Sequence, residues 1–192
     1  EAHIERAKNI REISKKVGRH IGILADLQGP KIRIQRFQDD FVKLKKGKPF
    51  TLDADLGEND GDENAVGLTY KALASDVSSG DILLLDDGLI ALKVAEVSGN
   101  KINCVVEIGG KLSNNKGVNR QGGGLSAGAL TKKDKQDIKL AAAMEADFLA
   151  VSFVRNADDV HEARRLLQEA GSDAWIVSKI ERAEAIDEIE EI

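Results

Sequence analysis

The sequence predicts an α/β fold in which a small all-β domain interrupts a series of βα units. Short, nearly continuous apolar runs, as at 21–27 and 148–153, are typical of parallel strands covered on both faces. Apolar residues at helical spacing accompany them, as at 4–17 and 157–167. Between 31 and 128 the pattern changes to short alternating segments, which indicates a separate closed β-barrel.

The first part of the chain contains one helix and one strand before the pattern changes. Residues 4–17 are amphipathic and Gly18 ends them, so a helix is expected there. The apolar run 21–27 includes Asp26, and Gly29-Pro30 then breaks the pattern. The strands expected in the inserted domain are 32–37, 49–53, 81–85, 89–97 and 101–108.

The helical pattern returns after the glycine run 122–124. Thr131 to Asp134 form a capping box ahead of an apolar helix, and Asn156 can cap the next one, which Gly171 ends. A buried strand, 174–181, and a last helix, 182–192, complete the pattern. The predicted division is therefore a first barrel segment, an inserted β-barrel and a second barrel segment, at 1–28, 29–128 and 129–192.

Composition excludes several classes of protein. The chain has 192 residues and no long apolar stretch, which argues against a membrane span. A net charge of -5 argues against general nucleic-acid binding. The sequence shows no secretory leader, so a cytoplasmic protein is expected. Cys104, the single cysteine, is expected to be a buried core thiol.

Polar side chains follow three apolar strands at their carboxyl ends. They are Asp26, then Ser152, then Lys179 with Glu181. Lys179 and Glu181 point to the same side of their strand, so a mutual salt bridge is one interpretation. The other is functional: Lys179 neutralises or protonates an anionic intermediate while Glu181 holds a divalent metal. In a βα barrel the carboxyl ends form one rim, where active sites are built.

The inserted domain has candidates of its own. Lys116 lies in a polar stretch from which it could reach a phosphate, although a loop lysine is often only solvated. The pair Asp86-Asp87 before Gly88 is a turn signal first of all. Arg33 could be a phosphate clamp or a surface charge. The insert leaves after Asp26 and returns before Thr131, so it is expected to act as a lid on the rim.

These motifs resemble the pyruvate kinase family, in a bacterial form, over essentially the whole chain. Several ordered motifs at compatible spacing are far more specific than any one of them. The segments that carry the resemblance are 26–33, 86–90, 112–119, 130–137, 150–155 and 176–181. The resemblance implies a partial TIM (β/α)8 barrel with an inserted all-β lid domain, and transfer of a phosphoryl group from phosphoenolpyruvate to ADP in glycolysis, giving pyruvate and ATP.

The resemblance also implies roles for individual residues. Lys179 matches the catalytic lysine that neutralises the phosphoryl group and the enolate, and Glu181 matches one of two carboxylates that hold Mg²⁺ or Mn²⁺. The nucleotide is expected near Arg33, Asp87 and Lys116. The substrate pocket is expected beside Ser152 and Phe153.

One departure from the family pattern concerns the monovalent cation. Potassium-dependent members carry a threonine after the aspartate and a glutamate after Gly-Pro, whereas this chain has Leu27 and Lys31. A fixed ammonium can replace a bound cation. Lys31 is therefore predicted to supply that charge beside Asp26, and K⁺ is not expected to be required.

A second departure concerns parts of the family pattern that these residues do not contain. The second metal carboxylate and several barrel strands have no counterpart in the 192 residues, so the isolated chain is expected to be inactive and to belong to a longer, homotetrameric enzyme. The alternative hypothesis is a non-catalytic β-barrel module that binds a nucleotide or a protein. That hypothesis explains the insert but not the three polar strand ends.

Overall fold

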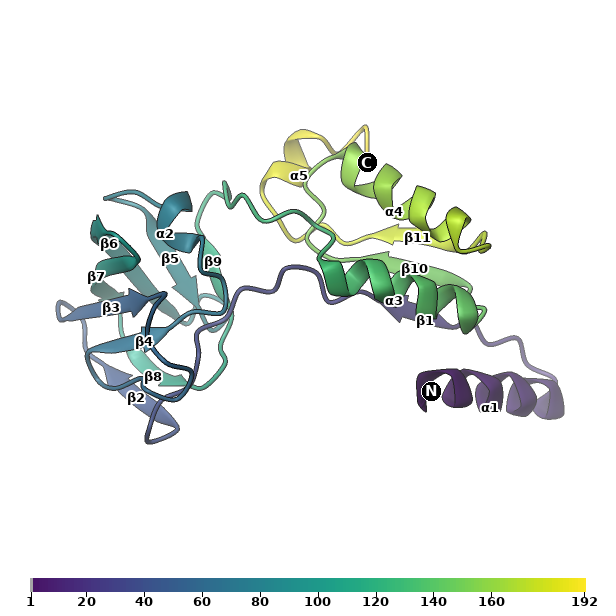
Figure 1. Cartoon of the computed structure of the whole chain (residues 1–192), viewed down its shortest axis with the longest axis horizontal. Helices are drawn as coiled ribbons and strands as arrows, with labels where there is room; N and C mark the ends of the chain where they lie inside the picture. Colours follow the sequence, from purple (N-terminus) through teal and green to yellow (C-terminus); the bar gives the residue numbers. More distant parts are fainter. Residues whose placement is uncertain (1) are drawn as a thin grey trace. The chain divides into compact units, whose positions relative to one another are not determined.

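The computed structural model describes residues 2–192, and Glu1, the first residue of the predicted segment 1–28, lies outside them. The chain divides into two compact units (Figure 1). Unit 1 comprises the residues up to Pro30 together with Ala127–Ile192, and unit 2 comprises Lys31–Ser126. Within residues 2–192, none of the helices combines the length and the apolar character that a bilayer crossing needs.

Unit 1 is built around a parallel sheet in the order β1-β10-β11. Its elements are α1 (Ala2–Val17), β1 (Leu24–Asp26), α3 (Lys132–Ala143), β10 (Phe148–Val151), α4 (Ala157–Glu169), β11 (Trp175–Ser178) and α5 (Glu184–Asp187). In the register of the sheet, Asp26 is opposite Ala150, which is opposite Val177. The alternation of strand and helix makes this an α/β fold, as predicted.

The helix starts of unit 1 agree with the sequence signals. The side chain of Thr131 accepts a hydrogen bond from the Asp134 backbone and completes a capping box at α3. The side chain of Asn156 caps α4 by accepting from the Asp159 backbone. Each cap satisfies backbone donors that have no partner within the helix.

The sheet of unit 1 has one covered and one open face. Leu149 and Val151 are fully buried in a core formed with residues of α3 and α4, which lie along that face in Figure 1. Leu24, Phe148 and Trp175 are aligned in the register and point to the other side. On that open face Trp175 is 74% exposed and Leu24 51% exposed.

The predicted last helix is much shorter than expected. The pattern predicts a helix over 182–192, whereas α5 covers only Glu184–Asp187. The residues that follow include Glu188, Glu190 and Glu191. Negative charges are unfavourable at the carboxyl end of a helix, where the helix dipole is already negative, so this sequence does not support further turns.

Unit 2 is an all-β unit with one short helix. Its elements are β2 (Phe41–Leu44), β3 (Pro49–Asp53), β4 (Ala65–Gly67), α2 (Leu73–Asp76), β5 (Ile82–Leu85), β6 (Ile90–Ser98), β7 (Lys101–Ile108), β8 (Gly110–Ser113) and β9 (Val118–Arg120). The main sheet has the order β4-β3-β7-β6-β5-β9, and β2 pairs with β8. Cys104 is buried in the core, as predicted, and burial raises the pKa of its thiol to about 12.

One predicted strand of unit 2 does not form as a regular strand. The alternating segment 32–37 makes only isolated bridges, and it changes partner along its length. Arg33 pairs with Gly117, Ile34 with Leu68 and Phe37 with Gly61. The alternating pattern predicted correctly that Ile32 and Ile34 are buried. It could not predict that the segment has a different pairing partner at each bridge, which prevents a regular strand.

Candidate active site

The carboxyl ends of the parallel strands in unit 1 bring three polar side chains together. The ammonium Nζ of Lys179 donates to both carboxylate oxygens of Asp26, at 3.2 and 3.3 Å, and to Ser152 Oγ at 2.9 Å. Ser152 Oγ lies 2.6 Å from the carbonyl oxygen of Leu27, to which it donates. Residues from β1, the β10 end and the β11 end thus meet because parallel strands in register end at one edge of the sheet.

Glu181 joins this group from the turn that follows β11. Its Oε1 lies 3.5 Å from Lys179 Nζ, and its Oε2 accepts a hydrogen bond of 3.1 Å from the Phe153 backbone. Phe153 has a φ of 58°, a left-handed conformation that is unfavourable for a residue with a large side chain. In this conformation the Phe153 N–H donates to the Glu181 carboxylate.

Gly29 makes room for that turn. Its φ is 65°, and a Cβ atom in its place would lie 2.8 Å from the Phe153 ring and 3.1 Å from Ser152 Cβ. A side chain at this position would push both residues out of place. The backbone N–H of Gly29 donates to the buried carboxylate of Asp134, which also accepts from the backbone N–H and the hydroxyl of Thr131.

The electrostatics of the cluster keep Lys179 charged. Partial burial lowers the pKa of Lys179, but its hydrogen bond to Asp26 and the attraction of Glu181 and Asp26 outweigh burial, so the pKa is raised. The ammonium therefore stays protonated at neutral pH. Its side chain is 32% exposed, which leaves it accessible to an anion from solvent. A fixed, accessible cation of this kind can stabilise negative charge that develops during a reaction.

The candidates of unit 2 form a separate group. Lys116 Nζ is paired with Asp86 at 2.8 Å, and the Arg33 guanidinium donates to the carbonyl of Asn115 at 2.7 Å. Arg33 and Lys116 are also close through the backbone, since Ile34 N–H donates to the Lys116 carbonyl. Asp87 is exposed in the adjoining turn, and Lys31 is exposed at the start of the unit.

The sequence matches a family of known proteins. The family description "Pyruvate kinase, barrel domain" matches residues 1–192. The chain belongs to the pyruvate kinase family. It is 57% identical over 186 residues to "Pyruvate kinase II" of Salmonella typhimurium, covering 97% of this chain and 39% of the relative. It is 54% identical over 184 residues to a pyruvate kinase of Haemophilus influenzae, covering 96% and 38%.

The match confirms the resemblance to pyruvate kinase noted in the sequence. A more distant relative, a pyruvate kinase of Corynebacterium glutamicum, is 40% identical over 190 residues, with 99% of this chain and 40% of the relative covered. The chain thus spans about two fifths of the length of the curated relatives that it matches. All three relatives are bacterial proteins that carry the name of a phosphotransferase.

The carboxylates of the cluster have the chemistry that a divalent metal of the pyruvate kinase family needs. Asp26 and Glu181 offer oxygen ligands, which Mg²⁺ and Mn²⁺ prefer. Within residues 2–192, no group of three or more acidic, histidine or cysteine side chains could enclose a metal. Glu181 has the donor chemistry of one protein ligand for such a metal.

Three residues at these sites were missed by the analysis of the sequence. Asp86, which the sequence marked only as part of a turn, is the acidic partner of Lys116. Asp134 was assigned only a capping role, although it also holds Gly29. Gly29 was treated as a pattern break, but its position directly after a strand and before Pro30 is a signal for close backbone approach.

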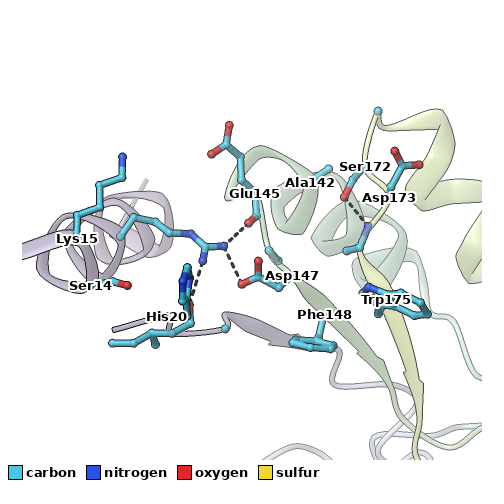
Figure 2. A pocket seen from close by; sticks show the side chains of 16 residues that line it. Ser14, Lys15, His20, Ala142, Glu145, Asp147, Phe148, Ser172, Asp173 and Trp175 are labelled. Carbon is cyan, nitrogen blue, oxygen red and sulfur yellow. Dashed lines mark hydrogen bonds and ion pairs between the residues drawn. The ribbon is translucent and has the colours of Figure 1, made fainter. Parts of the chain in front are cut away.

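The amino end of the same sheet contains a different polar cluster around a hollow of about 840 Å³. Figure 2 shows Glu145, Asp147 and Trp175 around this hollow. The Arg11 guanidinium donates to Asp147 at 2.8 Å and to the backbone carbonyl oxygens of Glu145 at 2.8 Å and Ile21 at 3.0 Å. Because two of these partners are backbone atoms, this cation fastens α1 to the segments that precede β1 and β10.

Proposed function

We propose that the protein containing this chain catalyses phosphoryl transfer from phosphoenolpyruvate to ADP, giving pyruvate and ATP in glycolysis. The observation that carries the proposal is the Lys179 ammonium, held at the carboxyl ends of parallel strands by Asp26, Ser152 and Glu181. Membership of the pyruvate kinase family supports the same reaction.

The reaction requires neutralisation of negative charge at the transferring group. A phosphoryl group in flight and the enolate that it leaves are both anionic, so a fixed cation lowers the barrier. Lys179 serves this role because it stays protonated and is accessible. Glu181 would hold a Mg²⁺ or Mn²⁺ ion, and that ion would supply further positive charge to neutralise the transferring group. Ser152 orients the ammonium, and Ser152 with Phe153 lines the substrate pocket.

We further propose that unit 1 is part of a (β/α)8 barrel and that unit 2 is its lid. The open face of the sheet supports the barrel, because Leu24, Phe148 and Trp175 form an apolar layer of the kind that fills barrel interiors. The connection supports the lid, because the insert leaves after the carboxyl end of β1 and returns before the amino end of α3. The proposed division remains 1–28, 29–128 and 129–192.

The nucleotide is assigned to unit 2. Arg33 and Lys116 supply two cations close together in the chain fold, and both are suited to phosphate oxygens. Asp87 is assigned to the same site. In this proposal Lys116 exchanges Asp86 for a phosphate when the nucleotide binds. Lys31 replaces the monovalent cation beside Asp26, so K⁺ is not required.

The complete enzyme is the unit of function in this proposal. The 192 residues are not expected to turn over phosphoenolpyruvate by themselves, because they supply only one of the two metal carboxylates expected for the family. The family resemblance supports a cytoplasmic homotetramer as the complete protein.

Turnover by the full-length protein tests the proposal. With phosphoenolpyruvate, ADP and Mg²⁺ it should form pyruvate and ATP in equal amounts, and omission of Mg²⁺ should abolish the reaction. The 192 residues alone should bind Mg-ADP weakly in a calorimetric titration and form no pyruvate. A full-length protein that binds Mg-ADP but forms no pyruvate would favour the alternative, a non-catalytic nucleotide-binding β-barrel.

A further inference from the structure

The chain passes from unit 2 back to unit 1 between Ser126 and Ala127. Ser126 is held by side chains of unit 2. The Ser126 backbone N–H donates to Asp76 at 3.0 Å, and the Ser126 hydroxyl lies 2.9 Å from the Tyr70 hydroxyl, which itself donates to Asp76 at 2.8 Å. Asp76 at the end of α2 and Tyr70 before it therefore fix the last residue of unit 2.

Unit 1 holds the next residue, Ala127. Its carbonyl oxygen accepts a hydrogen bond of 2.9 Å from the Arg182 guanidinium, whose second nitrogen donates to Glu184 at 2.9 Å. The Arg182 side chain is only 9% exposed. A planar guanidinium held by the Ala127 carbonyl and by Glu184 has little freedom to move, so these contacts hold the chain at Ala127.

The contacts of Ser126 and Ala127 hold two consecutive residues, one in each unit. The glycine run 122–124 has positive φ angles and would be the first choice for a hinge. It precedes Ser126, however, and Arg120 ties it to unit 2 by donating to the Gly123 carbonyl and to Asp81. The backbone of Ser126 is therefore held within unit 2, and that of Ala127 within unit 1.

Arg182 also follows Glu181 directly in the chain. Glu181 is bound to Lys179 and to the Phe153 backbone, so a shift of this segment moves the Arg182 backbone with it. We propose that Arg182 is a positioning residue, which couples the segment carrying Lys179 and Glu181 to the crossing at Ala127. This inference rests on the proposed function.

The coupling has a consequence in both directions. If the position of unit 2 changes the placement of Lys179 and Glu181, then ligands at those two residues must bias the position of unit 2 to the same extent. Nucleotide binding to unit 2 and phosphoenolpyruvate binding near Lys179 should consequently assist each other, and removal of the Arg182 side chain should reduce that assistance.

The test compares Arg182→Met, Arg182→Lys and the unmodified full-length enzyme. Arg182→Met should raise the KM for ADP measured at saturating phosphoenolpyruvate by about three- to tenfold, the range expected for loss of a coupling residue. Arg182→Lys keeps a cation that can donate to Ala127 and should restore most of the loss. Arg165→Met is the matched control, because Arg165 pairs only with Glu169 on the exposed surface of α4.

Hydrogen exchange supplies a measurement that a purely structural role would not change. In the unmodified enzyme, phosphoenolpyruvate with Mg²⁺ should slow exchange of the backbone amides at 125–129. In Arg182→Met that effect should be lost while the melting temperature stays close to that of Arg165→Met. Equal protection of these amides in Arg182→Met and the unmodified enzyme would overturn the proposal.

A second variant addresses the case in which Arg182→Met folds poorly. Asp76→Asn weakens the hold of unit 2 on Ser126 and lies outside the Lys179 cluster, so it should raise the KM for ADP in the same way. Unchanged kinetics in Asp76→Asn, with Arg182→Met unfolded, would refute the coupling. Absence of pyruvate formation by the unmodified enzyme would instead refute the proposed function.

Discussion

The two ends of the parallel sheet in unit 1 each hold a cation against a carboxylate, but with different partners. At the amino end Arg11 bonds to Asp147 and to two backbone carbonyl oxygens. At the carboxyl end the Lys179 ammonium contacts side chains, those of Asp26, Ser152 and Glu181. Backbone acceptors are fixed by the fold, whereas side-chain acceptors can rotate and be replaced by a ligand.

The difference distinguishes a structural ion pair from one that we propose to be functional. Arginine has a planar fork that fixes several acceptors at once, which suits a clamp between α1 and the strand starts. Lysine is a single mobile charge that can move from a carboxylate to a phosphate. The comparison teaches that the partners of a cation, more than its burial, indicate whether it is available for chemistry.

Replacement of Lys179 gives the largest expected effect. Lys179→Met in the full-length enzyme should lower kcat by about a thousandfold or more, because the transferring group loses its fixed cation. The melting temperature should change little, since the pairs that Lys179 makes are partly exposed. Lys135→Met, which removes an exposed pair with Glu162, is the control. A loss of only a few-fold would make Lys179 structural, like Arg11.

Replacement of Arg11 should have the opposite profile. Arg11→Met removes three hydrogen bonds from a charged donor and should lower the free energy of unfolding by roughly 1–2 kcal/mol, measured by urea denaturation, because two of the acceptors are backbone atoms but the contacts are partly exposed. The kcat should be unchanged, because the clamp is at the end of the sheet away from Lys179. A matched drop in kcat at a temperature where the variant is folded would contradict the division between the two ends.

Replacement of Lys31 tests whether its ammonium takes the place of a bound monovalent cation. Lys31→Glu restores the residue of potassium-dependent family members and should lower activity without K⁺ by about tenfold, or about 1.4 kcal/mol in the barrier. Addition of KCl at constant ionic strength should restore that activity in the variant and have little effect on the unmodified enzyme. Strong activation of the unmodified enzyme by K⁺ would show that Lys31 does not replace the cation.

The smallest effect is a pH dependence of the amino-end clamp. The backbone N–H of Ile23, together with Arg11, lowers the pKa of Asp147 below its usual value. A lowered pKa stabilises the folded state above the unfolded pKa, near 4, and this stabilisation is lost as pH falls through the folded pKa.

Asp147→Asn should therefore lower the free energy of unfolding by about 1 kcal/mol at pH 7, because the carboxylate is partly exposed. Unfolding curves of the two proteins should converge as the pH drops below 4. A difference that stays constant from pH 7 to pH 3 would show that the charge of Asp147 contributes nothing.

Much of unit 1 could be predicted because its signals are local. Apolar runs marked β1, β10 and β11, and the caps at Thr131 and Asn156 were read from a few neighbouring residues. The grouping of Asp26, Ser152 and Lys179 followed from the rule that parallel strands end together. Prediction was weaker for the segment 32–37 and for the last helix, where pairing and charge, not periodicity, decided the outcome.

By itself the sequence determined which side chains follow the strands, where helices begin, and which family the chain resembles, since these depend on residue type and short spacing. Only the tertiary structure decided that Phe153 turns its N–H toward Glu181, that Asp86 is the partner of Lys116, and that Arg182 holds Ala127. These contacts join residues far apart in the chain, and their existence depends on register and packing that no local pattern encodes.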